Sequence, residues 1–166
     1  LTNCTLYSNQ ASVGGGILLS DGSAAITNCI LWNNVSGGRS VLQQQLTGST
    51  VAVRYSCVQD SSPDDRAVIA GEGNTDDDPL FQDEDARDLR LSDGSPCIDA
   101  ADTLALPTDQ TDLDGDGDVA ELLPLDLDGL DRVSDDPSTI DSGVPVGVGG
   151  DVVDMGAYER RAPRRG

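Results

Sequence analysis

The first nine residues of the chain recur, with few changes, after an offset of 25 residues. The segment LTNCTLYSN at 1–9 returns as ITNCILWNN at 26–34, with threonine, asparagine and cysteine in the same places. A weaker third copy, VAVRYSCVQ at 51–59, carries Cys57 near the place of the earlier cysteines. Repeats in this length range are typical of solenoids, in which each unit buries its apolar side by stacking on the next.

The segments between the copies follow one order twice: a glycine-rich corner, a short strand, a turn and a second strand. Glycines at 14–16 and 37–38 mark the corners, and the segments that follow are short and show no helical periodicity. About three short parallel strands per repeat form one coil of a right-handed parallel β-helix, with rungs about 4.8 Å apart. We therefore expect an all-β fold, a right-handed parallel β-helix (solenoid) of about three coils with a loop-rich, acidic C-terminal cap. Equivalent residues should form ladders, with Asn3 beside Asn28.

The net charge of −20 falls unevenly along the chain, because nearly all acidic residues follow residue 60. We expect parallel β-helix coils over 1–60, an acidic calcium-binding cap with closing strands over 61–159, and a basic flexible tail over 160–166. A field of this sign repels nucleic acid and anionic lipid and attracts cations. No apolar run approaches the length of a membrane span. Because the chain opens inside a rung, we expect a processed product or a piece of a longer protein.

Histidine is absent from the sequence. This excludes Ser-His-Asp and Cys-His nucleophile pairs as well as histidine metal ligands. The four cysteines lack the CxxC spacing of zinc sites. The composition therefore favours a protein that is not an enzyme.

The acidic segment DLDGDGDVAE at 112–121 matches the start of a D-x-D-x-D-G calcium loop. Alternate carboxylates in a tight curl converge on one point, and Ca²⁺ takes six to eight oxygen ligands. The twelfth position of the motif is Leu123, so the closing carboxylate has to come from Glu121, Asp126 or Asp128. The alternative is a solvated acidic loop without an ion. The predicted Ca²⁺ ligands are Asp112, Asp114, Asp116, Asp118, Glu121 and Asp126.

The cysteines allow two interpretations. Cys4, Cys29 and Cys57 fall at matching places in the copies and predict a ladder of buried thiols. A disulfide between neighbouring rungs needs Cβ atoms about 3.8 Å apart, closer than the rung spacing. We therefore predict a disulfide between Cys57 and Cys97, which would connect the last coil to the cap; the alternative is that both remain free thiols.

Five motifs follow one another in the second half of the chain: DPLF at 78–81, LRL at 89–91, DGSPCIDA at 93–100, DLDG at 126–129 and VDMGAYE at 153–159. This order resembles the C-terminal choice-of-anchor Q region of bacterial right-handed parallel β-helix surface proteins. The elements GGIL at 15–18 and LYSN at 6–9 are similar to polymorphic outer-membrane-protein repeats. The resemblance implies a secreted, extracellular or cell-surface protein, and the family brings no enzymatic residues to carry over.

We expect a non-enzymatic extracellular structural or adhesive module, stabilised by calcium. Its open strand edges would pair with copies of itself or with adjoining β-helix segments, head to tail, in a surface layer or filament. Surface polysaccharide is a further expected partner. Two alternatives stay open: a pectate-lyase-like enzyme with Arg54 as its base, and a carbohydrate-binding module that uses Tyr7 and Trp32 as a platform.

Overall fold

The structure is a computed structural model that describes residues 1–19, 22–36, 39–40, 50–59 and 71–161. Within these residues the protein is almost entirely β and loop, without an α-helix. The elements are β1 (Thr5–Tyr7), β2 (Gln10–Ala11), β3 (Ser23–Thr27), β4 (Ile30–Trp32), β5 (Val35–Ser36), β6 (Arg39–Ser40), β7 (Thr50–Arg54), β8 (Cys57–Val58), β9 (Phe81–Asp83), β10 (Asp88–Leu91) and the 3-10 turn η1 (Thr103–Ala105). We call residues 1–59 the repeat region and residues 71–161 the cap.

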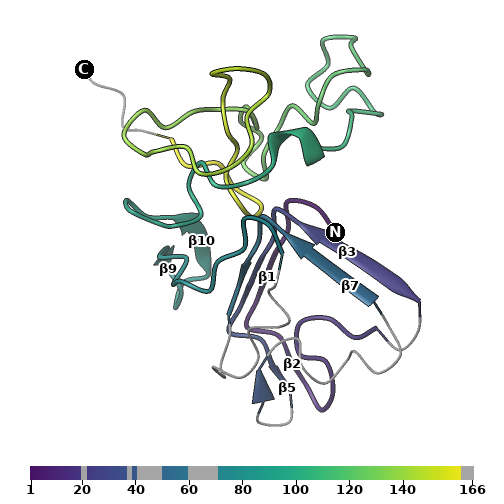
Figure 1. Ribbon diagram of the computed structural model, residues 1–166, viewed down its shortest axis with the longest axis vertical. Helices are drawn as coiled ribbons and strands as arrows, with labels where there is room; N and C mark the ends of the chain where they lie inside the picture. Colours follow the sequence, from purple (N-terminus) through teal and green to yellow (C-terminus); the bar gives the residue numbers. More distant parts are fainter. Residues whose placement is uncertain (20–21, 37–38, 41–49, 60–70, 162–166) are drawn as a thin grey trace.

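The copies of the repeat lie side by side as parallel strands. β1 pairs with β4, which pairs with β8, while β2 pairs with β5 and β3 with β7. Thr5 lies opposite Ile30 and Tyr7 opposite Trp32, so the first two copies keep the register that their sequences predict. These short sheets occupy the lower half of the molecule, and the loops of the cap lie above them (Figure 1). The prediction of an all-β fold with short parallel strands is thus confirmed.

One feature of the repeat region differs from the expectation. β6 pairs with β5 as an antiparallel strand, whereas a β-helix coil was expected to contain only parallel pairs. The predicted glycine corner at 37–38 and the strand expected after residue 40 lie outside the described residues, and so do residues 60–70.

The third copy of the repeat is shifted by one residue, which breaks the predicted ladder of three cysteines. Cys57 lies opposite Ile30, not opposite Cys29. The backbone N–H of Cys29 instead donates to the hydroxyl oxygen of Ser56 at 3.0 Å. Because successive side chains of a strand point to opposite faces, this shift turns Cys57 away from the side that Cys4 and Cys29 share.

Asparagine side chains connect the copies at the corners between strands. The amide of Asn28 donates to Oδ1 of Asn3 at 3.2 Å, and the amide of Asn9 donates to Oδ1 of Asn34 at 2.8 Å. Asn3 and Asn28 both have left-handed backbones, with φ of 49° and 55°, a conformation that asparagine tolerates better than most residues. The predicted asparagine ladder is therefore present.

The apolar residues form two cores that share β4. Leu31 packs with Ile26, Cys29, Val53 and Val58 inside the repeat region. On the other face of β4, Ile30 and Trp32 pack against the cap in a second core, whose cap residues include Phe81, Leu91, Cys97, Ile98, Val153 and Met155. All three residues of β4 are buried, as expected for a parallel strand covered on both faces.

The cap is held to the repeat region by backbone contacts around Gly156. The N–H of Gly156 donates to the carbonyl of Asn28 at 2.8 Å, and the N–H of Ala157 donates to Oγ1 of Thr5 at 3.1 Å. Nearby, the N–H of Met155 donates to the carbonyl of Cys97 at 2.9 Å. The VDMGAYE motif therefore lies against both parts of the molecule as the closing segment.

Within the described residues, no helix has the length and apolarity that crossing a bilayer requires.

Candidate metal centre

The predicted calcium loop brings three of its carboxylates together. One oxygen from each of Asp112, Asp114 and Asp116 lies within 4.8 Å of the other two. The N–H of Gly117 donates to Oδ1 of Asp112 at 3.0 Å, and the N–H of Asp116 donates to Oδ1 of Asp114 at 3.2 Å. These short-range bonds curl the backbone so that alternate side chains converge.

Gly117 allows the sharpest part of this curl. Its φ of 89° lies in the left-handed region, which glycine adopts without the steric cost that a Cβ brings. The D-x-D-x-D-G spacing therefore specifies a local structure as well as a set of ligands.

A second group shares Asp114 with the first. Oxygens of Asp109, Asp114 and Glu121 also lie within 4.8 Å of one another. Asp109 is 1% exposed, and its carboxylate accepts hydrogen bonds from the backbone N–H groups of Thr111 and Leu113. The N–H of Asp109 donates to the carbonyl of Glu121 at 2.9 Å, which brings the two ends of the loop together. Asp109 precedes the motif, so the spacing alone did not identify it.

Glu121 closes the loop from the other end, as one of the predicted ligands. Its Oε1 is shielded from solvent and has no hydrogen-bond partner among the described residues. Burial raises the pKa of this carboxyl, and the neighbouring charges of Asp114 and Asp116 raise it further. A buried carboxylate oxygen without a donor is costly unless a cation or a proton neutralises it.

The other two predicted ligands stand apart from these groups. Asp118 is exposed, and its Oδ1 accepts the N–H of Ala120 at 2.8 Å. Asp126 lies in a separate turn, where Oδ1 accepts the N–H groups of Asp128 and Leu130 and Oδ2 accepts that of Glu159. Backbone donors thus occupy both oxygens of Asp126. The structure therefore does not bring Asp126 to the carboxylate groups of the loop, and the DLDG sequence uses its carboxylate to form a separate turn.

Cys57 and Cys97 lie next to each other, as predicted, but as free thiols. Both residues are fully buried in the core between the repeat region and the cap. A hydrogen bond with Cys97, together with burial, raises the pKa of Cys57 far above its ordinary value. The Cys57 thiol is therefore protonated and unreactive as a nucleophile in this state. The structure does not contain the predicted disulfide, although it places the two partners together.

Arg132 forms a buried ionic contact that the sequence did not predict. Its side chain is 1% exposed, and its Nη2 donates to the carbonyls of Asp154 and Gly156, each at 2.9 Å. Nε lies 3.1 Å from Oε1 of Glu159. This guanidinium therefore holds the closing segment in place and is not available to a ligand.

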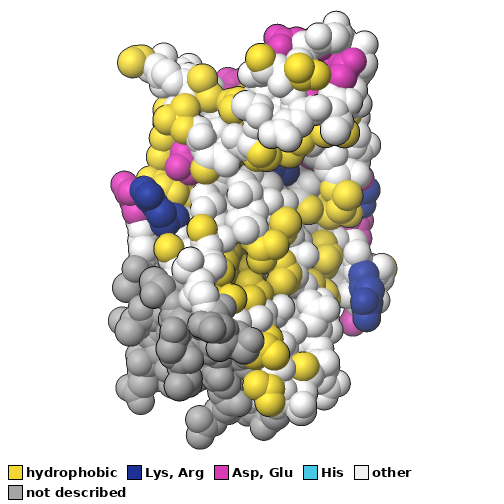
Figure 2. Space-filling view, turned by 90° about the vertical axis from the view of Figure 1, so that its right-hand side faces the viewer, with side chains coloured by type: hydrophobic (Ala, Val, Ile, Leu, Met, Phe, Trp, Pro, Cys, Tyr) yellow, Lys and Arg dark blue, Asp and Glu magenta, His cyan; other side chains and the backbone are white. Residues whose placement is uncertain are grey.

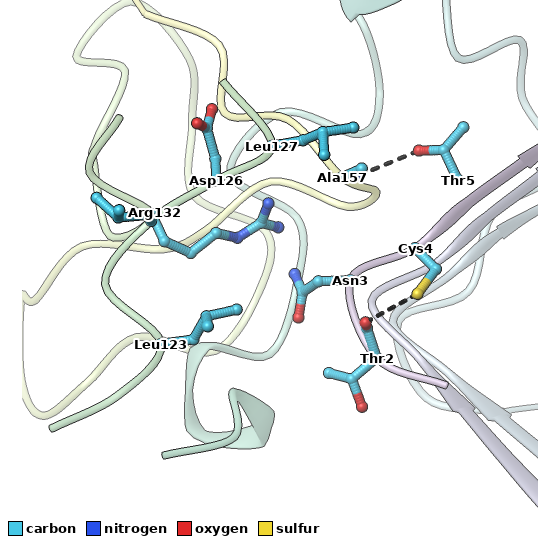
Figure 3. Close-up of a pocket in the computed structure, with 10 residues that line it drawn as sticks. Thr2, Asn3, Cys4, Thr5, Leu123, Asp126, Leu127, Arg132 and Ala157 are labelled. Carbon is cyan, nitrogen blue, oxygen red and sulfur yellow. Dashed lines mark hydrogen bonds between the residues drawn. The ribbon is translucent and has the colours of Figure 1, made fainter. Parts of the chain in front are cut away.

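A cavity of about 420 Å³ lies between the start of β1 and the cap. Asn3, Leu123 and Arg132 are among its lining residues, and Figure 3 shows them on opposite sides of the space, from the repeat region and from the cap. Asp126 also lines it, but its carboxylate accepts the three backbone N–H groups given above. The cavity lacks the converging acidic groups of the 109–121 loop and is not the metal centre.

The basic end of the chain is partly built into the cap. Arg160 forms ion pairs with Asp93 and Asp136, and its side chain is 9% exposed. Nη2 of Arg161 donates to the carbonyl of Asp131 at 2.6 Å. Arg160 and Arg161 were predicted to belong to a flexible tail, and both instead contact other residues of their own chain. The rest of that predicted tail, 162–166, lies outside the described residues.

No protein-family profile, curated protein or solved structure matches the chain.

Proposed function

We propose that this protein is a non-enzymatic, calcium-stabilised structural module of an extracellular or cell-surface assembly. Its repeat region is the end of a right-handed parallel β-helix, and the acidic cap closes that helix. The arrangement of the 109–121 loop carries this proposal, because its carboxylates form two groups that share Asp114. One group includes Glu121, whose buried Oε1 has no donor among the described residues.

Calcium is the cation that best suits the loop. All the converging atoms are carboxylate oxygens, which are the preferred ligands of hard divalent cations. Asp112, Asp114 and Asp116 are only partly buried or exposed, so water molecules can complete the six to eight oxygens that Ca²⁺ takes. In this interpretation the ion ties the loop to Asp109 and Glu121, and its role is structural.

Chelation of calcium tests this proposal directly. The free energy of unfolding should rise by about 2.7 kcal/mol when free Ca²⁺ reaches about 100 times its Kd, because the ion binds only the folded loop. The variant D112N/D114N should lose the part of that gain that comes from the ion in the loop. D76N, which changes an exposed aspartate outside the carboxylate groups, should keep the whole gain. Equal melting temperatures of the parent protein in Ca²⁺ and in EDTA would contradict the proposal.

An open strand edge supports the assembly part of the proposal. β1 is at the edge of its sheet, and its three residues are only half-buried, whereas those of β4 are fully buried. At the other edge, β8 is covered by a parallel bridge between Cys57 and Thr75. Unpaired strand edges pair with other strands unless they are blocked. We propose that a further coil, from an adjoining β-helix segment or from a second copy, stacks on β1.

The surface is compatible with such stacking. On the face next to β3, hydrophobic side chains are exposed along the middle of the molecule, and acidic ones gather at the cap end (Figure 2).

Sedimentation velocity and negative-stain microscopy at rising protein concentration test self-assembly. Head-to-tail polymers would support a second copy as the partner of β1. A protein that stays monomeric at every concentration would exclude a second copy and leave an adjoining β-helix segment as the partner.

The two alternative functions find little support in the geometry. Trp32 is 8% exposed beneath the cap, and Tyr7 packs edge-on against Phe81 with ring centroids 5.5 Å apart. These aromatic rings therefore do not form the open platform that a sugar would need. Arg54, the candidate base of a lyase, is ion-paired with Glu72 at 2.8 Å on the surface.

A further inference from the structure

Asp99 is a fully buried aspartate at the centre of the cap. Its residue is 0% exposed, and its backbone is left-handed with φ of 49°. The N–H of Asp99 donates to Oδ1 of Asp154 at 2.8 Å, and its carbonyl accepts the N–H groups of Ser142 and Gly143. The surrounding backbone therefore fixes the position of this side chain.

The two oxygens of the Asp99 carboxylate have different surroundings. Oδ1 accepts the N–H of Asp136 in a long hydrogen bond of 3.4 Å. Oδ2 is buried and has no partner among the described residues. A carboxylate oxygen excluded from water without a donor loses its solvation free energy and gains nothing in return. A folded protein tolerates this where a proton or a cation completes the site.

Two further carboxylates approach Asp99 from the surface. One oxygen from each of Asp99, Asp135 and Asp141 lies within 4.8 Å of the others, and the last two residues are exposed. Burial, together with the charges of Asp135 and Asp141, raises the pKa of Asp99 to about 7. Burial also raises the pKa of Asp135, with added effects of Asp141 and Asp151. The negative charges in this group are therefore incompletely neutralised.

The nearest positive charge is already paired. Arg160 lowers the pKa of Asp99, but its guanidinium forms ion pairs with Asp136 and Asp93. It cannot also supply a donor to Oδ2 of Asp99, which stays unpartnered. Asp99 thus has an unpartnered buried oxygen and belongs to a group of three carboxylates, two of which are exposed to water.

We propose that Asp99, Asp135 and Asp141 bind a second calcium ion, with Oδ2 of Asp99 as the buried ligand. This site is distinct from the 109–121 loop and shares no residue with it. The ion would fix the segment around 135–144 to Asp99, the same segment whose N–H groups at Ser142 and Gly143 bond to the Asp99 carbonyl. The inference does not depend on occupancy of the loop.

Calcium stoichiometry tests the second site on the whole chain. Native mass spectrometry and calorimetry with CaCl₂ should detect binding in the loop variant D112N/D114N/D116N, because its Asp99 site is intact. Adding D135N/D141N to that variant should remove the remaining ion or raise its Kd about tenfold or more, since two charged ligands are lost. Both substitutions are on exposed side chains, so the fold should survive, and circular dichroism checks this.

Two controls make the result decisive. Adding D76N to the loop variant should change nothing, because Asp76 is an exposed aspartate outside every carboxylate group. Adding D99N should weaken calcium binding as D135N/D141N does. If the loop variant binds no calcium, or if D135N/D141N leaves its Kd unchanged, the second site is overturned. If the loop variant binds as many ions as the parent protein, the loop proposal fails and the second site stands.

Discussion

Nε of Arg132 lies 3.1 Å from Oε1 of Glu159, and both side chains are almost completely excluded from solvent. The two residues belong to different loops of the cap. Burial and the charge of Asp154 raise the pKa of Glu159, and the guanidinium of Arg132 lowers it. The net effect is a pKa well above the ordinary value of a glutamate, and the positive charge of Arg132 opposes that rise.

Substitution of Arg132 by methionine should destabilise the protein by about 3–5 kcal/mol, because it leaves the carboxylate of Glu159 buried without its partner. Urea unfolding at neutral pH measures this change. The double variant R132M/E159Q should recover part of the loss by removing the unpaired charge. As a matched control, R54M breaks the exposed pair with Glu72 and should cost less than about 1 kcal/mol. Equal losses in R132M and R54M would contradict the structural role of Arg132.

Substitution of Gly156 by alanine should loosen the contact between the cap and the repeat region. A Cβ at this position would lie 2.8 Å from Cδ1 of Ile30 and 2.8 Å from Oγ1 of Thr5, at a φ of 92°. We expect a loss of about 2–4 kcal/mol from the combined strain and steric overlap. G94A is the matched control, since Gly94 has a φ of 80° and open space around it; it should cost only about 1 kcal/mol. Trp32 fluorescence reports the disturbance, because that ring is buried at the junction.

The calcium-free protein should lose stability as the pH rises from about 4 to about 7. The pKa values of Asp99 and Asp154 are each raised to about 7, mainly by burial. Between the ordinary aspartate pKa and this value the folded state binds more protons than the unfolded state, so deprotonation favours unfolding. Urea unfolding in EDTA across this range measures the slope, and D99N should reduce it. A stability that rises with pH over the same window would contradict the prediction.

Oxidation should join Cys57 to Cys97 without unfolding the protein. The two thiols are in contact in the core, and closing a loop of this length stabilises a fold by about 4 kcal/mol in the chain-entropy description. After refolding with glutathione disulfide, non-reducing peptide mapping should detect this link, and C97S should abolish both the link and the added stability. C29S should keep the link. A disulfide between Cys4 and Cys29 in its place would contradict the prediction.

The sequence was informative where structure depends on local or periodic patterns. The offset between the first two copies predicted the pairing of Thr5 with Ile30, because a fixed period forces equivalent residues into one register. The D-x-D-x-D-G spacing likewise predicted that Asp112, Asp114 and Asp116 converge. The one-residue shift at Cys57 was not predictable, since the residue-by-residue match had already weakened in the third copy.

Contacts between distant loops could not be predicted in the same way. Arg132 and Glu159 follow no periodic pattern, and only the folded cap brings them together. The grouping of Asp99 with Asp135 and Asp141 is of the same kind. Nor did the sequence show that Asp126 lies in a turn of its own, where its carboxylate accepts the N–H of Asp128.

The two faces of β4 have a consequence for how the molecule comes apart. Leu31 belongs to the core of the repeats, while Ile30 and Trp32 belong to the core beneath the cap. Detaching the cap would expose one side of a strand whose other side stays packed, so neither half can melt without weakening the other. The chain should denature in a single cooperative step, and grafting this cap onto another protein would require transplanting β4 along with it.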